Sequence, residues 1–285
     1  MNSFSMVKAM LTRSAGWRNA LILLAILLGS PTANAEESYT FAVTPQFEQR
    51  KLFAIWQPVV DELSRRTGYK LKLVATLTVP DFERELAKGS FDFAYINPYL
   101  LVKKDQRQGY IPLVRDQQPL RGILVVRKDS PYKIPAELDG AKFAVPAFDA
   151  LGACLLLRAE LEQMFKAKLI PVDVKSHSSV YLQVATGQLP AGGGVEKTLQ
   201  VQDKAVQDML RVLYTTHDMP SHPIVGHPRL PAKVRQTVQR ALLEFSATDE
   251  GKKLLQQIPM SAPVPASIQD YAPMKNLGLE AYLTD

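Results

Sequence analysis

The sequence predicts an α/β fold made of two successive α/β units. Short apolar segments typical of strands alternate with longer segments in which apolar residues recur every three or four positions, as on one face of a helix. This alternation begins near residue 39 and starts again after Ser130. The chain has 285 residues, 46% of them hydrophobic, which is enough for one large domain or two of medium size. Strand–helix alternation of this kind favours a mostly parallel sheet.

The first unit opens with a short apolar strand over residues 39–43 and a long helix over residues 47–68. Apolar residues in this helix lie at spacings of three and four, and Gly68 ends it. The other elements expected in this unit are strands over 70–76, 91–96, 110–115 and 122–129, and helices over 78–89 and 97–109.

The second unit repeats the plan. Its expected elements are strands over 142–145, 169–176 and 211–216, helices over 151–161 and 179–188, and a strand from 223 that leads into helical sequence as far as 258. The segment "PAGGGVEKTLQ" (190–200) lies between two of these elements and is rich in small residues. We interpret its three glycines either as a flexible connection or as a wall that leaves room beside a ligand.

The turn "DALGA" (149–153) joins a strand of the second unit to its first helix. Such a turn gathers unpaired backbone N–H groups at the positive end of the helix dipole, so it can hold an anion. This turn has no Ser, Thr, Lys or Arg side chain to assist. We expect Asp149 to cap the helix that begins at Leu151, and a carboxylate in that place would also repel an anion.

Residues 1–35 have the features of a secretory signal peptide. Three basic residues form the start, an apolar run follows over 20–29, and "SPTANA" places small residues before a cleavage site after Ala35. The apolar run of about ten residues is short for a membrane span. No cysteine at the cleavage site could carry a lipid anchor. The alternative is an uncleaved N-terminal anchor.

Charge and residue content disfavour several classes of function. Without residues 1–35, 31 of the 34 basic residues remain against 28 acidic ones, a net charge of +3, and this mild excess does not predict nucleic-acid binding. Cys154, the single cysteine, lies in apolar helical sequence and is expected to be a buried, unreactive thiol. His217, His222 and His227 are expected in loops, and we find no residue pattern typical of a metal, cofactor or catalytic site.

Three segments carry a resemblance to a known family. "FDFAYINPYLLVKK" (91–104) is a strand leading into a helix, "GILVVRKDSPYKIPAELDGAKFAV" (122–145) starts with a strand that passes between the units, and "ALLEFSATDEGKKLLQQI" (241–258) is a closing helix. In their order and spacing they resemble the PhnD-like periplasmic phosphate, phosphite and phosphonate binding proteins. The resemblance covers about residues 38–280.

This resemblance implies a two-lobe type II periplasmic binding fold, in which two α/β lobes close on a ligand by a hinge motion. Lobe 1 would comprise residues 36–120 and 223–285, and lobe 2 residues 121–222. The resemblance further implies a monomeric periplasmic protein, without a cofactor, that binds a small solute in the cleft and delivers it to an inner-membrane ABC permease.

The resemblance also implies which residues line the ligand cleft. They lie after the first strand, at the end of the strand over 91–96, in the turn before the helix from Leu151, and at the start of the next helix. In that order they are Thr44, Gln46 and Phe47; Tyr95 and Asn97; Asp149, Ala150, Leu151 and Gly152; and His177 and Ser178.

The chain departs from the phosphonate binders of this family in two places. They have a Ser-Thr-Ser run where this chain has Ala150, Leu151 and Gly152, and each lost hydrogen bond to a charged group is worth about 1.5–3 kcal/mol. Their amine-binding carboxylates are also unmatched, because glycines stand near that place and Glu196 is the only acid nearby. We therefore expect a phosphonate-like ligand or another small oxyanion or organic solute, without inferring an amino group.

Three functions are compatible with such a fold. The first is the solute-binding component of an ABC importer. The second is a periplasmic ligand-binding partner of a membrane sensor or signalling protein, which nothing in the sequence separates from the first. The third is an enzyme on the same fold, which is disfavoured because we find no pairing of a nucleophile with a base.

Overall fold

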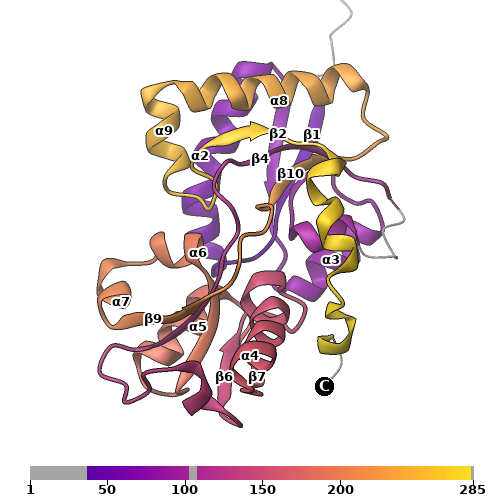
Figure 1. Cartoon of the computed structure of the whole chain (residues 1–285). Coiled ribbons are helices and arrows are strands. Elements are labelled where there is room, and N and C mark those ends of the chain that lie inside the picture. The colour runs from indigo at the N-terminus through magenta and orange to yellow at the C-terminus, as the bar shows by residue number, and fades with distance from the viewer. Residues whose placement is uncertain (1–36, 103–107, 284–285) are drawn as a thin grey trace, which may run out of the picture. The chain divides into compact units, whose positions relative to one another are not determined.

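The described part of the chain forms two β-sheets, each covered by helices (Figure 1). The computed structural model describes residues 37–102 and 108–283. The predicted signal peptide and its cleavage site lie outside these residues. Among the described residues, no helix has the length and apolar character that crossing a membrane requires.

The first sheet has six strands in the order β11-β4-β10-β3-β1-β2. Their bounds are β1 Ser38–Val43, β2 Lys70–Val74, β3 Phe93–Tyr95, β4 Ile111–Asp116, β10 Pro223–Gly226 and β11 Pro263–Pro265. Strand β1 is parallel to β2 and β3, whereas β10 is antiparallel to β3 and β4, and β11 is antiparallel to β4. The sheet is therefore mixed.

Both faces of the first sheet are buried, because successive strand residues point to opposite sides. Phe41 and Val43 of β1 belong to the core under α2 and α8, and Ala42 between them belongs to the core on the other face. The covering helices are α2 Gln49–Thr67, α3 Val79–Ala87, α8 Ala232–Ala247 and α9 Asp249–Leu255, with short 3₁₀ helices η1 Pro98–Leu101, η4 Ile268–Asn276 and η5 Leu279–Tyr282. Figure 1 shows α8 above the strands of this sheet.

The second sheet has five strands in the order β7-β6-β8-β5-β9. Their bounds are β5 Gly122–Arg127, β6 Lys142–Val145, β7 Ile170–Asp173, β8 Ala191–Val195 and β9 Leu210–Thr215. Its helices are η2 Pro135–Leu138, the π-helix η3 Leu151–Leu156, α4 Leu157–Phe165, α5 His177–Ala185, α6 Glu196–Gln200 and α7 Lys204–Asp208. Strand β6 is parallel to β7 and β8, and β5 is antiparallel to β8 and β9.

Two short segments carry the chain between the sheets, from β4 to β5 and from β9 to β10. Leu120 and Met219 form an antiparallel bridge where these segments pass each other, with N–H···O distances of 2.7 and 3.0 Å. Two paired segments of this kind are the connection that a hinge between two lobes requires. The lobe boundaries given above nevertheless stay a prediction.

The expectation of a mostly parallel sheet is wrong, because both sheets combine parallel and antiparallel pairs. Strands that follow one another through α2, α3, α4 and α5 make the parallel pairs. Strands β5 and β10 arrive directly from the other sheet and run against their neighbours. Of the helix predicted over 97–109, the described part contains the four-residue 3₁₀ helix η1. The segment 190–200, left without an element, forms β8 and α6.

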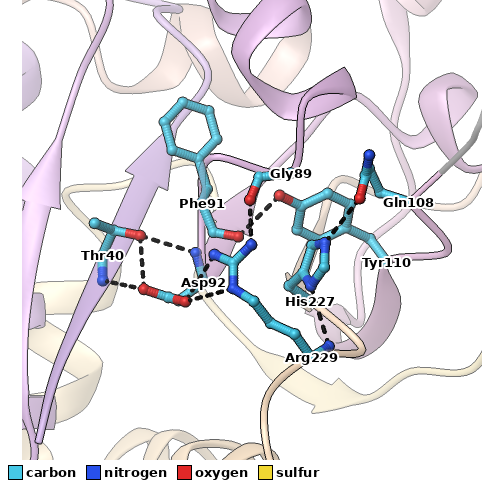
Figure 2. Close-up of polar contacts among 8 residues, drawn as sticks. All are labelled: Thr40, Gly89, Phe91, Asp92, Gln108, Tyr110, His227 and Arg229. Atoms are coloured by element: carbon cyan, nitrogen blue, oxygen red, sulfur yellow. Dashed lines mark hydrogen bonds and ion pairs between the residues drawn. The ribbon is translucent and has the colours of Figure 1, made fainter.

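A polar cluster ties β1, β3 and the loop after β10 together at the amino end of β3 (Figure 2). The Asp92 carboxylate accepts hydrogen bonds from the N–H and hydroxyl of Thr40 at 2.9 and 3.0 Å and from Arg229 Nη2 at 2.7 Å. The His227 N–H donates to the Asp92 carbonyl at 2.8 Å, and Arg229 also donates to the Gly89 carbonyl. These bonds hold the strands at one end, and the candidate site lies at the opposite, carboxyl ends of β1 and β3.

Candidate ligand-binding site

A cavity of about 420 Å³, including its space open to solvent, lies where β1, β3 and β6 end. Ligands of open α/β folds bind at the carboxyl ends of strands. The lining residues come from both sheets and their helices: Thr44, Pro45, Gln46, Val79, Asn97, Pro146, Ala147, Ala150, Leu151, Gly152, Ala153, His177, Val195 and His222. None of them is an acid, a lysine or an arginine, so the cavity offers neutral polar groups on a largely apolar wall.

The start of η3 provides backbone donors to this cavity. The N–H groups of Cys154 and Leu155 both donate to the Ala150 carbonyl, at 2.9 and 3.1 Å. Among the described residues, no backbone carbonyl accepts from the N–H groups of Leu151, Gly152 or Ala153. Because η3 continues directly into α4, these three N–H groups lie at the positive end of a long helix and can hold an anion.

The expectation that Asp149 caps this helix is wrong. The cap residue is Ala150, which makes no side-chain cap hydrogen bond. A π-helical start explains the difference, because the widened turn brings two N–H groups onto one carbonyl. Asp149 contributes its carbonyl, which accepts a hydrogen bond from Asn97 Nδ2 at 3.3 Å and so connects the end of β3 to the turn.

The glycines of "GGG" bring the helix start close to the second sheet. A Cβ on Gly193 would lie 1.9 Å from the Ala153 carbonyl oxygen, and one on Gly194 would lie 2.2 Å from the Tyr181 hydroxyl. These residues form the buried strand β8, so both earlier interpretations, a flexible connection and a wall beside the ligand, are wrong. The glycines instead allow η3 and α5 to pack directly on the strand backbone.

The segment after β1 is fixed by hydrogen bonds to its neighbours. Thr44 donates to the Tyr95 carbonyl through both its N–H, at 3.0 Å, and its hydroxyl, at 2.9 Å. The Gln46 N–H donates to the Thr44 carbonyl at 2.8 Å, and the Gln46 carbonyl accepts from the His177 N–H at 2.9 Å. Gln46 is only 3% exposed, and within the described part of the chain its side-chain Oε1 has no hydrogen-bond partner.

Two uncharged histidines line the cavity. Burial lowers the pKa of His177 to about 3, with a smaller contribution from the nearby His222, and burial also lowers the pKa of His222 to about 3. His177 Nδ1 lies 3.2 Å from Thr198 Oγ1, whereas the His222 ring stacks on Tyr95 with centroids 5.4 Å apart. At neutral pH each ring therefore offers one N–H donor and one bare nitrogen, and neither carries a positive charge.

A second, smaller cavity adjoins the first. It shares Gln46, Val195 and His222 with the first cavity, and it also reaches Asp116 and Lys197. Lys197 Nζ donates to Ser261 Oγ at 2.8 Å and lies 3.6 Å from the Asp116 carboxylate. This carboxylate also accepts from the N–H groups of Gln118, at 3.0 Å, and Ser261, at 2.8 Å. The two charges compensate each other, and the ion pair joins α6 to the end of β4.

The structure brings most of the predicted site residues to the first cavity. Thr44, Gln46, Asn97, Ala150, Leu151, Gly152 and His177 line it. Tyr95 lines only the second cavity, and its hydroxyl donates to the Pro259 carbonyl at 3.2 Å. Phe47 is buried in the core under α2, and Ser178 donates to Gln202 Oε1 at 3.3 Å outside either lining. Whether these residues contact a ligand stays a prediction.

His222 is the most informative lining residue that the sequence did not identify. It does lie in a loop, as expected, but that loop is the second connection between the sheets and passes the cavity. Its position two residues before the segment "IVG" of β10 was the available signal, because a connection that re-enters the first sheet must pass the ends of its strands.

A known protein family matches most of the chain. A family model described as the periplasmic substrate-binding protein of ABC phosphonate transporters matches residues 41–271. No curated protein sequence matches the chain.

Many solved structures are similar to this chain, among them the following three. A binding protein component of an ABC phosphonate transporter from Pseudomonas aeruginosa has a TM-score of 0.75 at 16% identity, covering 87% of each chain. PhnD1 from Prochlorococcus marinus, in complex with methylphosphonate, has a TM-score of 0.74 at 13% identity, covering 87% of this chain and all of that one. A Xanthomonas citri protein bound to ATP has a TM-score of 0.61 at 14% identity, covering 87% and 96%. At these identities the similarity establishes the fold, which is the two-lobe α/β architecture expected.

Proposed function

The chain belongs to the family of periplasmic substrate-binding proteins of ABC phosphonate transporters, and from this premise we propose that its first cavity binds the anionic head group of a small phosphonate-like solute. The observation that carries the proposal is the start of η3, where the N–H groups of Leu151, Gly152 and Ala153 have no backbone acceptor among the described residues. They line the cavity at the positive end of a helix.

The neutral lining suits recognition by hydrogen bonds. With no lysine or arginine in the lining, the oxyanion would be held by the backbone N–H groups of the turn and by N–H groups of His177 and His222. The hydroxyls of the Ser-Thr-Ser run in related proteins would be replaced in part by these rings. A methylphosphonate complex in the PhnD1 relative supports the choice of this ligand class as the first to test.

The remaining expectations belong to the same proposal. The leader would be cleaved after Ala35, and residues 36–120 with 223–285 and residues 121–222 would move as two lobes about the paired segments at Leu120 and Met219. The closed protein would act as a monomer without catalytic activity or affinity for nucleic acid, and would deliver its ligand to the permease.

The test removes one N–H group from the turn. Leu151 is the first residue of the helix, where proline is tolerated, and Ala150 before it has φ −63° and ψ 112°, outside the α region that a following proline disfavours. Leu151→Pro therefore deletes a donor while keeping the helix. Leu151→Ala is the matched control, because it loses the buried leucine side chain but keeps the N–H group.

Binding of methylphosphonate, phosphite and phosphate would be measured on residues 36–285 by thermal shift and calorimetry. A ligand at 100 times its Kd adds about 2.7 kcal/mol of stability, which raises Tm by roughly 5–10 °C in a chain of this size. We expect Leu151→Pro to bind at least about tenfold more weakly than Leu151→Ala, because a hydrogen bond to a charged group is lost. Equal affinities in the two variants would exclude the turn as the anion site. Binding of none of these anions would favour a different solute or the signalling alternative.

A further inference from the structure

The side-chain amide of Gln46 is the polar group in the site whose needs the protein does not meet. Gln46 is 97% buried, and its Oε1 has no hydrogen-bond partner among the residues that the structure describes. The backbone on either side is fixed by the bonds to Thr44 and His177. Gln46 lines both cavities, at their junction. A buried acceptor held in such a place indicates that a donor arrives with the ligand.

The charges around this amide indicate which kind of donor it accepts from. The first cavity has no charged lining residue, and His177 and His222 are neutral. In the second cavity the Asp116 carboxylate is already compensated by Lys197 and by two backbone N–H groups. An ammonium group would therefore find no uncompensated negative charge, whereas a hydroxyl needs only the neutral acceptor.

We propose that the ligand is an oxyanion whose short carbon chain carries a hydroxyl group, and that this hydroxyl donates to Gln46 Oε1 while the anionic group lies at the start of η3. The inference rests on the proposed function, because it takes the anion to be bound at that helix start. Gln46 is then the residue that selects among ligands with the same head group. An analogue without the hydroxyl leaves the buried acceptor unpaired and binds about tenfold or more weakly.

The test compares three phosphonates with side chains of equal heavy-atom number: 2-hydroxyethyl-, 2-aminoethyl- and propylphosphonate. Calorimetry on residues 36–285 should give the 2-hydroxyethyl compound the lowest Kd, about tenfold or more below each of the other two. In Gln46→Leu, which removes the amide acceptor, the ratio between the hydroxyethyl and propyl compounds should fall to about one. Methylphosphonate, which has no hydroxyl, is the control for the anion site: the variant should lose less affinity for it than for the hydroxyethyl compound.

Each other outcome has a definite meaning. If methylphosphonate binds but the original chain does not distinguish hydroxyethyl from propyl, or prefers the amine, the hydroxyl inference fails and the proposed function stands. A preference for the hydroxyl that survives in Gln46→Leu also overturns the inference, because another group then accepts the bond. If no phosphonate binds, methylphosphonate included, the proposed function fails and the hydroxyl inference fails with it.

Discussion

Replacing Gly193 with alanine tests whether the close packing of β8 on the helix start shapes the site. A Cβ at this position would lie 1.9 Å from the Ala153 carbonyl oxygen and 3.0 Å from its carbonyl carbon. Real Cβ atoms essentially never approach a heavy atom closer than 3.0 Å, so the two backbones must separate by about 1 Å. Both sides of the contact are backbone, and no side-chain rotation can relieve it.

The expected magnitude follows from two opposing effects. Overpacking of a well-packed core costs about 1–3 kcal/mol, and more where the backbone must move. Alanine in a strand gains about 0.5–1 kcal/mol over glycine through the unfolded chain. We expect a net loss of about 2 kcal/mol or more in the free energy of unfolding, which lowers Tm by roughly 4–8 °C. The displaced carbonyl belongs to Ala153, so the neighbouring N–H groups move too, and anion affinity should fall at least about tenfold.

The assay measures urea unfolding and methylphosphonate binding on Gly193→Ala and on the matched variant Gly192→Ala. A Cβ at Gly192 would meet Val180 Cγ1 at 2.6 Å and Val184 Cγ2 at 2.9 Å, which are side-chain atoms of α5 and not the backbone of the helix start. Gly192→Ala should therefore also lose stability but keep its affinity. A Gly193→Ala chain with unchanged Tm and unchanged affinity would refute the reasoning, because the helix start would then not depend on this contact.

Three further predictions follow from buried groups. The unfolded chain protonates each histidine near pH 6.5, but burial keeps the pKa of His177 and His222 at about 3 in the folded chain. Their contribution to stability is thus complete above pH 6.5 and falls by about 1.4 kcal/mol per pH unit for each histidine as the pH is lowered toward 3. Replacing both histidines by Asn should therefore make the urea midpoint depend less on pH between 6.5 and 5. An unchanged pH dependence would contradict this. The side chains of the Lys197 and Asp116 ion pair are 15% and 2% exposed. A double-mutant cycle of Lys197→Met, Asp116→Asn and the double variant should therefore give a coupling of at least about 1 kcal/mol in the free energy of unfolding. A coupling near zero would mean that the pair does not stabilise the fold. Trp56 is fully buried and is the single tryptophan after residue 36, so the folded chain should emit in the blue and shift to the red once, on unfolding; red emission from folded protein would contradict the packing.

The alternation of strands and helices could be predicted because it depends on local patterns. The strand over 39–43, the helix after it and the family resemblance were all confirmed. The direction of strands could not be predicted in the same way, because a strand that returns from the other sheet has the same local pattern as one that follows a helix. The antiparallel placement of β10 beside β3 depends on chain path alone.

The positions of the candidate site residues were predictable where they follow from strand ends, and not where they depend on tertiary contacts. Thr44 and Asn97 follow strands and line the cavity as that rule expects. Tyr95, one residue after Ala94 in β3, packs on Trp56 of the core, with ring centroids 4.9 Å apart, and lines only the second cavity. The role of Gly193 could not be read from its neighbours, because a buried strand and a flexible connection can have the same composition.

The π-helical turn also contains a natural reporter of how often the site opens. Cys154, the only cysteine, lies inside that turn with none of its surface exposed. A thiol reagent can reach it only while the turn is displaced, so the labelling rate counts how often the turn opens. Any solute that occupies the neighbouring N–H groups must slow this labelling in proportion to its occupancy. The natural thiol of Cys154 can therefore report the opening of the site without an engineered residue.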